Sequence, residues 1–434
     1  MSCLFVLVHC KVKTDQRSQR NRATSWQTKA VDGRDPLVYL GCLSRDRASL
    51  RLRKAIIDSS GASADIGVDM NIFESRRQRA QELMAQHDVA ALHITSRENY
   101  FYLTGDIRNV ARIFLPQKGE PIVIVFDEEV ESAKKATGIE DVRGWRSPQD
   151  LMRTFFSITK EYDLREKKVG FCVHSTPAFL LHRVQQLNPK MIVIESEEIL
   201  MPLRYTKDPT EIDLMRKAAE VADKGLEAAV SAIAPGRTEI EVAGEAEYAM
   251  RRAGAMRFAT STFVDSGPHS LHLHGGTVRR KIEPGDLVVI DVHPIVDMYA
   301  CDAARTVTCG SPSTNQKSLI KLYAEVQETV LNAMRPSWKV SAVTEMFLKL
   351  FTDKGYGSQW ISGPVHGVGL EFEEWPHPSH YPSHLQLEMK ENWTLAIGHS
   401  LLTVRPVGGV RIEDTVLLNP TGGECLTRTP KLLN

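Results

Sequence analysis

The sequence lacks any excess of charge of one sign. Its 434 residues include 54 basic and 54 acidic side chains, so the formal net charge is zero. DNA, RNA and anionic membranes are bound largely through a positive field, which this balance does not supply. A run of about 18 apolar residues, the length that spans a bilayer, is also missing. We therefore expect no nucleic-acid partner and no membrane partner.

Cysteine is scarce, and its spacing is irregular. The seven cysteines are scattered without any C-x-x-C pair. An odd, scattered set speaks against a disulfide scaffold and a thiolate zinc site, and it fits a reducing compartment. The hydrophobic fraction of 42% is ordinary for a globular chain. Length and composition together indicate a cytoplasmic protein with two domains.

The first 69 residues differ in composition from the rest. Residues 1–10 are apolar, but the basic residues follow them, whereas a secretory signal carries basic residues in front. Residues 11–54 are rich in Arg and Ser and poor in acids, as transit peptides are. We expect instead a disordered or spurious extension over 1–69, with Met70 as an alternative start, and assign it no function.

Residues 71–200 alternate between helical and strand-like patterns. Helical spacing of apolar residues over 71–84 precedes a short apolar run at 90–95. Further strand-like runs lie at 111–115, 121–126, 168–172 and 191–195, with a helical stretch at 177–187. Strands that alternate with helices predict an α/β domain.

Residues 202–434 show a different pattern. A linker at 201–209 is predicted to lead into a helix over 210–233, and a capping box at Thr238 and Glu241 starts the next helix. The remaining elements are strands at 258–264, 287–292, 298–308, 395–404 and 410–418, and helices at 314–334 and 340–354. Helix pairs beside antiparallel strands predict an α+β second domain.

Two aspartates flank a predicted hairpin. The apolar strand 285–291 ends in Asp291, a turn lies near 294–297, and Asp302 follows on the second strand. A hairpin centred between 296 and 297 would place the two residues opposite each other, with Cβ atoms about 4.5–5.5 Å apart.

Two carboxylates at that distance repel, and one pKa rises unless a cation lies between them. Carboxylate oxygens suit Mg, Mn, Fe or Zn, so a divalent metal is the natural solution. The alternative is a pair of aspartates in turns and caps. The strongly apolar strand that ends at Asp291 favours the metal.

Two further candidates lie downstream. His366 sits among glycines and small apolar residues, and Glu413 sits in an apolar strand near Arg411. Alternation along that strand would turn Arg411 and Glu413 to the same face. Either residue taken alone is also consistent with a structural role.

In this order and setting, the residues resemble the pita-bread metallopeptidases: methionine aminopeptidase, prolidase, aminopeptidase P and the related creatinase. The motifs are NYFYLTG at 99–105, RYTKDPTEI at 204–212, SGP at 266–268, HGVGL at 366–370 and GVRIED at 409–414. The resemblance covers about 71–425. It implies a creatinase/prolidase-like N-terminal domain over 71–200 and a pita-bread catalytic domain over 202–434.

The resemblance also implies a metal site. In the family, two aspartates, one histidine and two glutamates bind two divalent ions, commonly Mn, Co, Zn or Fe, which activate a water. Asp291, Asp302, His366 and Glu413 take four of these five ligand positions.

Residues around the ligands take their expected roles from the same resemblance. His274 falls where the family keeps a histidine near the substrate and its developing charge, so we expect it to be catalytic. His269 and His272 are expected at the surface or behind the site. Arg411 would orient Glu413 or meet a substrate carboxylate, and orientation is favoured.

Three positions depart from the family pattern. Gly398 stands where the fifth ligand, a glutamate, should be, and a regular strand would turn His399 away from the site unless a bulge intervenes. Glu373 replaces a histidine that handles the leaving group. His293 is either a substitute ligand or merely the residue before a proline. One metal ion, or altered ligation by His293 or His399, is therefore expected.

Three functions remain open. The first is a metal-dependent hydrolase of the Xaa-Pro dipeptidase or aminopeptidase P type, a homodimer that acts on a short peptide or other small molecule. The second is a creatinase-like C–N hydrolase or a lyase for small zwitterions, favoured by Gly398 and Glu373. The third is a catalytically silent binding module, against which the four retained ligands argue.

Overall fold

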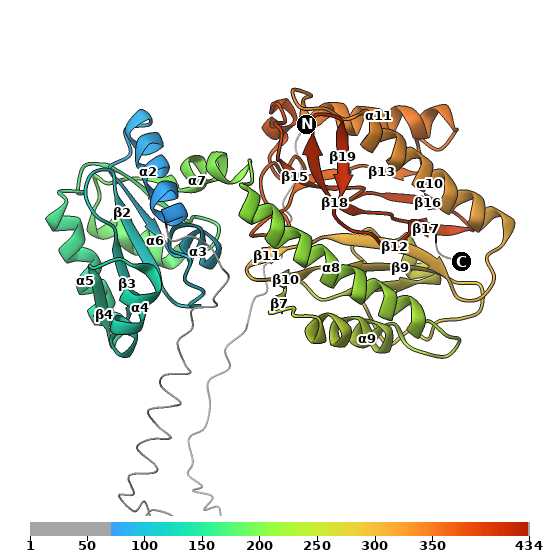
Figure 1. Cartoon of the computed structure of the whole chain (residues 1–434), viewed down its shortest axis with the longest axis horizontal. Coiled ribbons are helices and arrows are strands. Elements are labelled where there is room, and N and C mark those ends of the chain that lie inside the picture. Colours follow the sequence, from blue (N-terminus) through green and yellow to red (C-terminus); the bar gives the residue numbers. More distant parts are fainter. Residues whose placement is uncertain (1–70, 433–434) are drawn as a thin grey trace, which may run out of the picture. The chain divides into compact units, whose positions relative to one another are not determined.

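A mixed six-stranded sheet forms the core of the first domain in the computed structural model, which describes residues 71–432 (Figure 1). The predicted extension 1–69 lies outside the described residues. The strand order is β4-β3-β2-β1-β5-β6. The strands are β1 (Ala91–Ile94), β2 (Arg112–Pro116), β3 (Ile122–Phe126), β4 (Val142–Trp145), β5 (Lys168–Phe171) and β6 (Ile192–Glu195). Strand β4 was not predicted, because its residues are only half-buried and include a glycine, so no apolar run marks it.

Helices pack around this sheet. They are α2 (Asn71–Gln86), α3 (Arg97–Thr104), α4 (Val130–Thr137), α5 (Pro148–Glu161), α6 (Ala178–Leu187) and α7 (Glu197–Arg204), with the short η1 (Asp127–Glu129). The predicted linker 201–209 is wrong over its first part, because α7 continues to Arg204 with Pro202 inside it. Buried Met201 and Arg204 anchor that end of the helix.

Four long helices build the outer layer of the second domain. They are α8 (Pro209–Ala232), α9 (Glu239–Arg252), α10 (Thr314–Ala333) and α11 (Val340–Asp353). Helices α8, α9 and α10 each begin with a capping box, in which two orphan backbone N–H groups gain side-chain acceptors. All four agree with the predicted helices to within two residues. Within 71–432, no helix combines the length and apolar character needed to cross a bilayer.

The strands of the second domain form four small antiparallel sheets, ordered β11-β10-β7, β12-β9-β8, β13-β16-β17 and β14-β15-β18-β19. Their bounds are β7 (Arg257–Phe258), β8 (Phe263–Ser266), β9 (Leu287–Val292), β10 (Pro294–Val296), β11 (Tyr299–Ala300), β12 (Ala303–Thr308), β13 (Trp360–Ile361), β14 (Val365–Gly367), β15 (Thr394–Ile397), β16 (Leu401–Val404), β17 (Gly408–Val410), β18 (Asp414–Asn419) and β19 (Gly422–Cys425). Short helices η2 (Gly267–Leu271) and η3 (Pro382–Gln386) lie between them.

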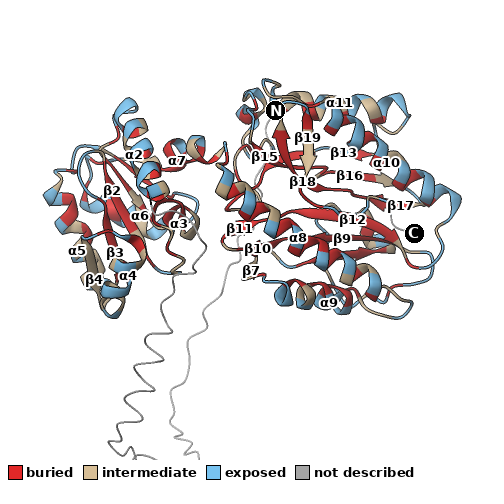
Figure 2. Cartoon of the chain, in the orientation of Figure 1, coloured by how far each residue is buried: buried red, intermediate tan, exposed pale blue. Residues whose placement is uncertain are grey.

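The sheets of this domain are covered by its helices. Helices α8 and α9 contact β8 to β12, whereas α10 and α11 contact the strands that come later in the chain (Figure 1). Figure 2 shows the strands largely buried and the outward helix faces exposed. Every residue of β9 is buried, which accounts for the apolar run that precedes Asp291.

The hairpin that carries the two aspartates has a different register from the predicted one. Asp291 pairs with Ala304, not with Asp302. The turn is centred between Asp297 and Met298, which have φ values of 46° and 73°. The centre of the turn therefore lies one residue later than predicted. Each residue of the first strand consequently pairs with a residue two positions later than predicted. Because side chains alternate with a period of two, the shift leaves Asp291 and Asp302 on the same face.

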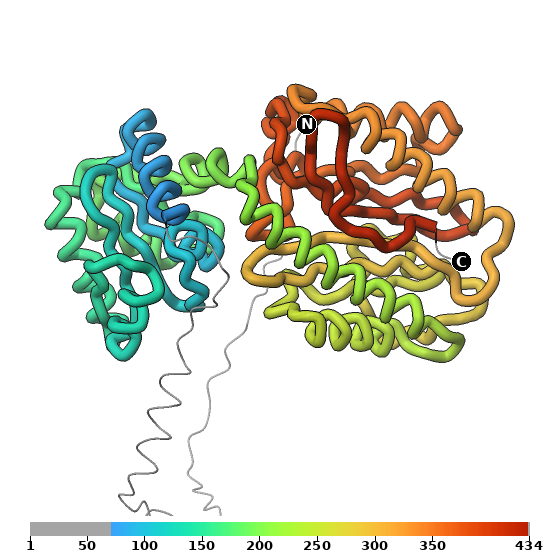
Figure 3. The backbone as a smooth tube through the Cα atoms, in the orientation of Figure 1, coloured from blue at the N-terminus to red at the C-terminus, as the bar shows by residue number. Residues whose placement is uncertain are grey.

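The segment around Glu413, distant in sequence, pairs with the second strand of this hairpin. Ala304 and Glu413 exchange both backbone hydrogen bonds, at 3.1 and 3.0 Å. The Thr415 hydroxyl accepts from the Asp302 N–H and donates to the Asp302 carbonyl, both at 2.9 Å. Figure 3 shows β12 running next to the C-terminal strands. These bonds fix the backbone of Asp302 against that of Glu413.

Replacement of Thr415 by valine tests this connection. The substitution keeps the side-chain shape but leaves two buried backbone groups of Asp302 unpaired, so we expect the free energy of unfolding to fall by about 2 kcal/mol. Urea unfolding measures the change. Thr329→Val is the control, because its hydroxyl bonds within an exposed turn of α10; a shift within about 0.5 kcal/mol is expected there. Equal shifts for both variants would contradict the assignment.

Candidate metal centre

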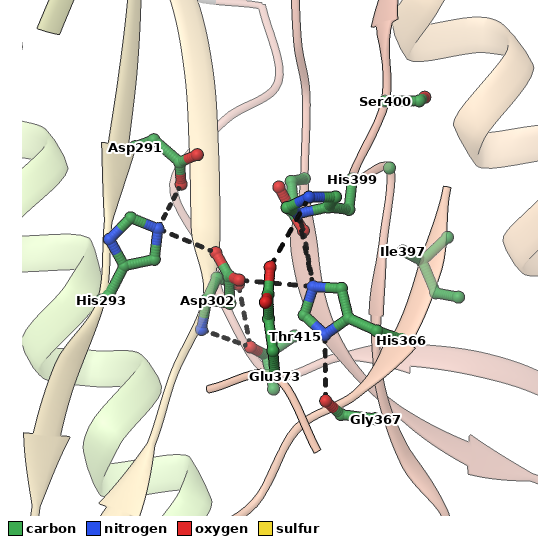
Figure 4. A network of polar contacts seen from close by, with 12 residues as sticks. Asp291, His293, Asp302, His366, Gly367, Glu373, Ile397, His399, Ser400 and Thr415 are labelled. Carbon is green, nitrogen blue, oxygen red and sulfur yellow. Dashed lines mark hydrogen bonds and ion pairs between the residues drawn. The ribbon is translucent and has the colours of Figure 1, made fainter. Parts of the chain in front are cut away.

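Six titratable side chains converge between the segment β9 to β12 and the later strands β14 to β18 of the second domain (Figure 4). Asp291, His293 and Asp302 come from β9 and the loops that follow it. His366 lies in β14, His399 in the loop between β15 and β16, and Glu413 just before β18. The structure therefore brings together the four ligand candidates of the sequence and both substitute candidates.

The first group contains Asp291, His293 and Asp302. The Nε2 atom of His293 lies 3.1 Å from Asp291 Oδ1 and 3.5 Å from Asp302 Oδ1. In Figure 4 the imidazole lies between the two carboxylates. All three side chains are at most 2% exposed. His293 is therefore more than the residue before a proline, because its ring faces both aspartates.

The second group contains Asp302, His366, His399 and Glu413. His366 Nε2 lies 3.5 Å from Asp302 Oδ2 and 3.6 Å from Glu413 Oε1. His399 Nδ1 lies 3.2 Å from Glu413 Oε1. Within each group the candidate ligand atoms lie within 4.8 Å of one another. Asp302 belongs to both groups, with Oδ1 facing His293 and Oδ2 facing His366.

Burial and mutual repulsion shift the acidities of these groups. Burial raises the pKa of Asp302, and the nearby Glu413 charge raises it further, to about 6. Burial also opposes ionisation of Glu413, but His399 and His366 outweigh it and hold its pKa well below the usual range. Burial lowers the pKa of His293, yet Asp291 and Asp302 raise it to about 9. The carboxylates thus depend on positive charge beside them.

Several buried carboxylate oxygens of the described chain have no hydrogen-bond partner. They are Asp291 Oδ1, both oxygens of Asp302 and Glu413 Oε2. An unpaired buried acceptor is costly, and a cluster of them facing one space calls for a cation. Carboxylate oxygens with imidazole nitrogens form a donor set suited to Mn, Fe, Co or Zn. The residues therefore fit a divalent metal.

Arg411 contacts Asp291 instead of Glu413. Its Nη1 lies 2.5 Å from Asp291 Oδ2, and its Nη2 donates to the Leu273 carbonyl at 2.7 Å. Strand β17 ends at Val410 and β18 begins at Asp414, so Arg411 and Glu413 lie outside a regular strand and the alternation used to predict their common face does not apply. Arg411 is thus placed to orient Asp291, whereas the sequence predicted that it orients Glu413.

His274 lies at the edge of the site. The residue is exposed, and its Nε2 lies 3.3 Å from His399 Nε2. Burial and the neighbouring His399 lower its pKa. His269 instead pairs with Glu239 at 3.0 Å and stacks on His272 at 5.7 Å. Neither His269 nor His272 belongs to a ligand group of the described residues.

The expectation that His399 faces away from the site is wrong. Strand β15 ends at Ile397, and Gly398 has a φ of +111°, so strand alternation stops before His399. A Cβ at Gly398 would lie 2.0 Å from the Ile412 carbonyl oxygen. Only a glycine fits this backbone, and its conformation turns the next residue inward.

Glu373 has a partner that the sequence reasoning missed. Its Oε2 lies 3.3 Å from His377 Nε2, and its Oε1 lies 3.8 Å from His399 Nε2. Burial opposes ionisation of Glu373, but His377, His366 and His399 lower its pKa to about 2. The segment that holds Glu373 and His377 is neither helix nor regular strand, so no local pattern signals their contact.

Comparison with known proteins agrees with this geometry. Residues 213–420 match the model of metallopeptidase family M24, and residues 76–206 match the creatinase/prolidase N-terminal domain. A Xaa-Pro dipeptidase of Pyrococcus furiosus is 29% identical over 364 residues, covering 83% of this chain and all of that protein. A Xaa-Pro dipeptidase of Lactobacillus delbrueckii is 27% identical, covering 80% of this chain and 94% of the relative.

Solved structures resemble the fold as a whole. The prolidase of Pyrococcus horikoshii superposes with a TM-score of 0.73 at 28% identity, covering 82% of this chain and 99% of that one. A Xaa-Pro dipeptidase of Bacillus anthracis has a TM-score of 0.75 at 24% identity, covering 83% and 99%. Residues 213–420 therefore form a pita-bread catalytic domain of metallopeptidase family M24, which follows a creatinase/prolidase N-terminal domain.

Proposed function

We propose that this chain is a metal-dependent hydrolase of the Xaa-Pro dipeptidase type, which cleaves the bond before proline in a short peptide. The convergence of four ligand candidates around unpaired, buried carboxylate oxygens carries the proposal. The names of the relatives, which include Xaa-Pro dipeptidases that this chain matches over nearly their whole length, support the substrate class.

Asp291, Asp302, His366 and Glu413 would hold the divalent metal, one or two ions of Mn, Co, Zn or Fe. A bound ion supplies an activated water and polarises the scissile carbonyl. The chain prepares its ligands through a second set of contacts. His366 Nδ1 donates to the Gly367 carbonyl at 2.9 Å, which leaves the lone pair on Nε2 directed at Asp302 and Glu413.

Two side chains would act on the substrate directly or through a ligand. Arg411 holds Asp291 in place by its ion pair, so its role is to position a ligand. His274 lies beside His399 at the edge of the site, where it could donate a hydrogen bond to the oxygen that gains charge during attack. We assign His274 the catalytic role on that basis.

A second candidate is hydrolysis of a C–N bond, or a lyase reaction, in a small zwitterion. Two observations favour it. Gly398 removes one carboxylate from the ligand pattern of the family, and Glu373 puts a carboxylate near the site where a histidine is expected. A carboxylate there would attract a cationic group of a substrate.

Compartment and assembly are further parts of the proposal. Cys172, Cys301 and Cys309 are buried free thiols, which supports a reducing compartment such as the cytoplasm. The homodimer is proposed from the resemblance to the family. Light scattering of the purified chain would give its mass in solution directly.

Asp302→Ala is expected to abolish metal binding and activity while the fold is retained. Asp302 faces both ligand groups, so its loss removes a donor from each. Elemental analysis of dialysed protein measures metal content, and circular dichroism measures the fold. Asp213→Ala, at an exposed position of α8, is the control and should keep both metal and activity. Unchanged metal content in Asp302→Ala would refute the site.

A dipeptide panel tests the substrate class. The metal-loaded chain is expected to hydrolyse Gly-Pro or Ala-Pro faster than Gly-Ala, and chelation should remove the activity. Liquid chromatography of the released amino acids measures the rates. Failure on all three dipeptides, with metal bound, would exclude the peptidase and favour the second candidate.

His274→Ala is expected to lower kcat by about 10²-fold, the usual loss when one donor to the developing charge is removed. Metal content should not change, because His274 is outside the ligand groups of the described residues. His272→Ala, an exposed neighbour, is the matched control. A loss of metal in His274→Ala would assign that residue to the centre itself.

A further inference from the structure

Two departures from the family pattern lie next to each other in space. The resemblance to the family implies a glutamate at position 398 and a histidine at 373, whereas this chain has Gly398, followed by His399, and Glu373. His399 Nε2 and Glu373 Oε1 are 3.8 Å apart. Relative to the family pattern, the imidazole and the carboxylate have thus exchanged positions across the site. The site still contains one of each, as His399 and Glu373.

We propose that His399 supplies its Nδ1 to the metal centre in place of the missing carboxylate, and that Glu373 positions the ring from behind. The inference rests on the proposed function, because it assumes that the centre holds a divalent ion. It goes beyond that function by assigning a ligand that the family pattern does not contain.

The backbone at Gly398 excludes the family's glutamate. A Cβ there would lie 2.0 Å from the Ile412 carbonyl oxygen and 3.0 Å from Gln327 Nε2. The φ of +111° is also a conformation that residues with a side chain rarely adopt. A carboxylate cannot return to this position without movement of the strands, so the replacement ligand has to come from elsewhere.

His399 is directed into the centre by one ring nitrogen. Nδ1 lies 3.2 Å from Glu413 Oε1 and 3.3 Å from His366 Nε2. The side chain is 13% exposed, so it borders the site and is not part of the core. Figure 4 shows its ring above that of His366, on the side of the site opposite Asp291. Its position makes it a donor to the same space as Asp302 and Glu413.

The other ring nitrogen faces the groups that would position it. Glu373 Oε1 lies 3.8 Å from Nε2, longer than a hydrogen bond but close enough for its charge to attract the Nε2 proton, and Glu373 Oε2 lies 3.3 Å from His377 Nε2. A carboxylate behind a ligating imidazole fixes the ring orientation and strengthens the ligand. Glu373 is thus a positioning residue for His399, and His377 holds Glu373.

The exchange changes the chemistry of the donor set. A neutral imidazole replaces a charged carboxylate, so the centre loses one negative charge and gains a nitrogen donor. Imidazole suits Zn, Co, Ni and Fe, whereas carboxylate suits Mn and Mg. The centre should therefore prefer Zn or Co over Mn more strongly than a site with the full carboxylate set.

Metal titration of the full chain tests the ligand. After chelator treatment and dialysis, the chain is titrated with Co(II), Zn(II) and Mn(II) by calorimetry, and the visible spectrum of the Co(II) form reports the ligands. His399→Ala should weaken Co(II) and Zn(II) binding at least about tenfold, since even groups behind a ligand cost about 10–100-fold. The Co(II) spectrum should change as well. His182→Ala, at an exposed position of α6, should change neither.

Two further variants separate ligation from structure. His399→Glu returns a carboxylate to this position and should lower the ratio of Zn(II) to Mn(II) affinity. Glu373→Ala should weaken metal binding about tenfold, and Glu373→Gln, whose amide oxygen still accepts a hydrogen bond, should restore most of it. Urea unfolding should give the same midpoint for all variants without metal.

The outcomes distinguish this inference from the proposed function. If His399→Ala binds metal as wild type does, His399 is not a ligand, even when Xaa-Pro dipeptides are cleaved. If His399→Ala weakens metal binding but no dipeptide is cleaved, the ligand assignment stands and the proposed function fails. If the wild-type chain binds none of the three metals, both are overturned.

Discussion

The repulsion among three buried carboxylates is the constraint on which this structure depends. Asp291, Asp302 and Glu413 are at most 1% exposed, and several of their oxygens have no hydrogen-bond partner. Charges so close in a medium of low polarity are stable only when cations face them. Arg411 and the imidazoles around the site supply part of that charge, and a divalent ion would supply the rest.

The scaffold keeps these charges together by joining chain segments more than a hundred residues apart. The backbone pair of Ala304 and Glu413 and the double hydrogen bond of Thr415 connect the hairpin of Asp302 to the C-terminal strands. Arg305 strengthens the junction through a buried ion pair with Asp414 at 2.6 Å. Ligands on or next to strands that are fixed in this way converge more accurately than ligands carried on free loops.

The departures from the family pattern form a coherent set and do not resemble decay. The conformation of Gly398 excludes a side chain and at the same time turns His399 inward. Glu373 carries a depressed pKa because His377, His366 and His399 surround it, although burial opposes its ionisation. A site that had lost its use would leave such buried charges unpaired, at a cost in stability.

The sequence by itself determined the two domains' element types, the four long helices and the side chains proposed to carry the chemistry, because capping boxes, apolar periodicity and motif order are local signals. It missed β4, misplaced the centre of the hairpin and turned His399 the wrong way. Only the tertiary structure decided those points. Register depends on the φ values of Asp297 and Met298, and the direction of His399 depends on how close Ile412 approaches Gly398. Neither a positive φ at a residue other than glycine nor the close approach of another strand segment is recorded in a local pattern of residue types.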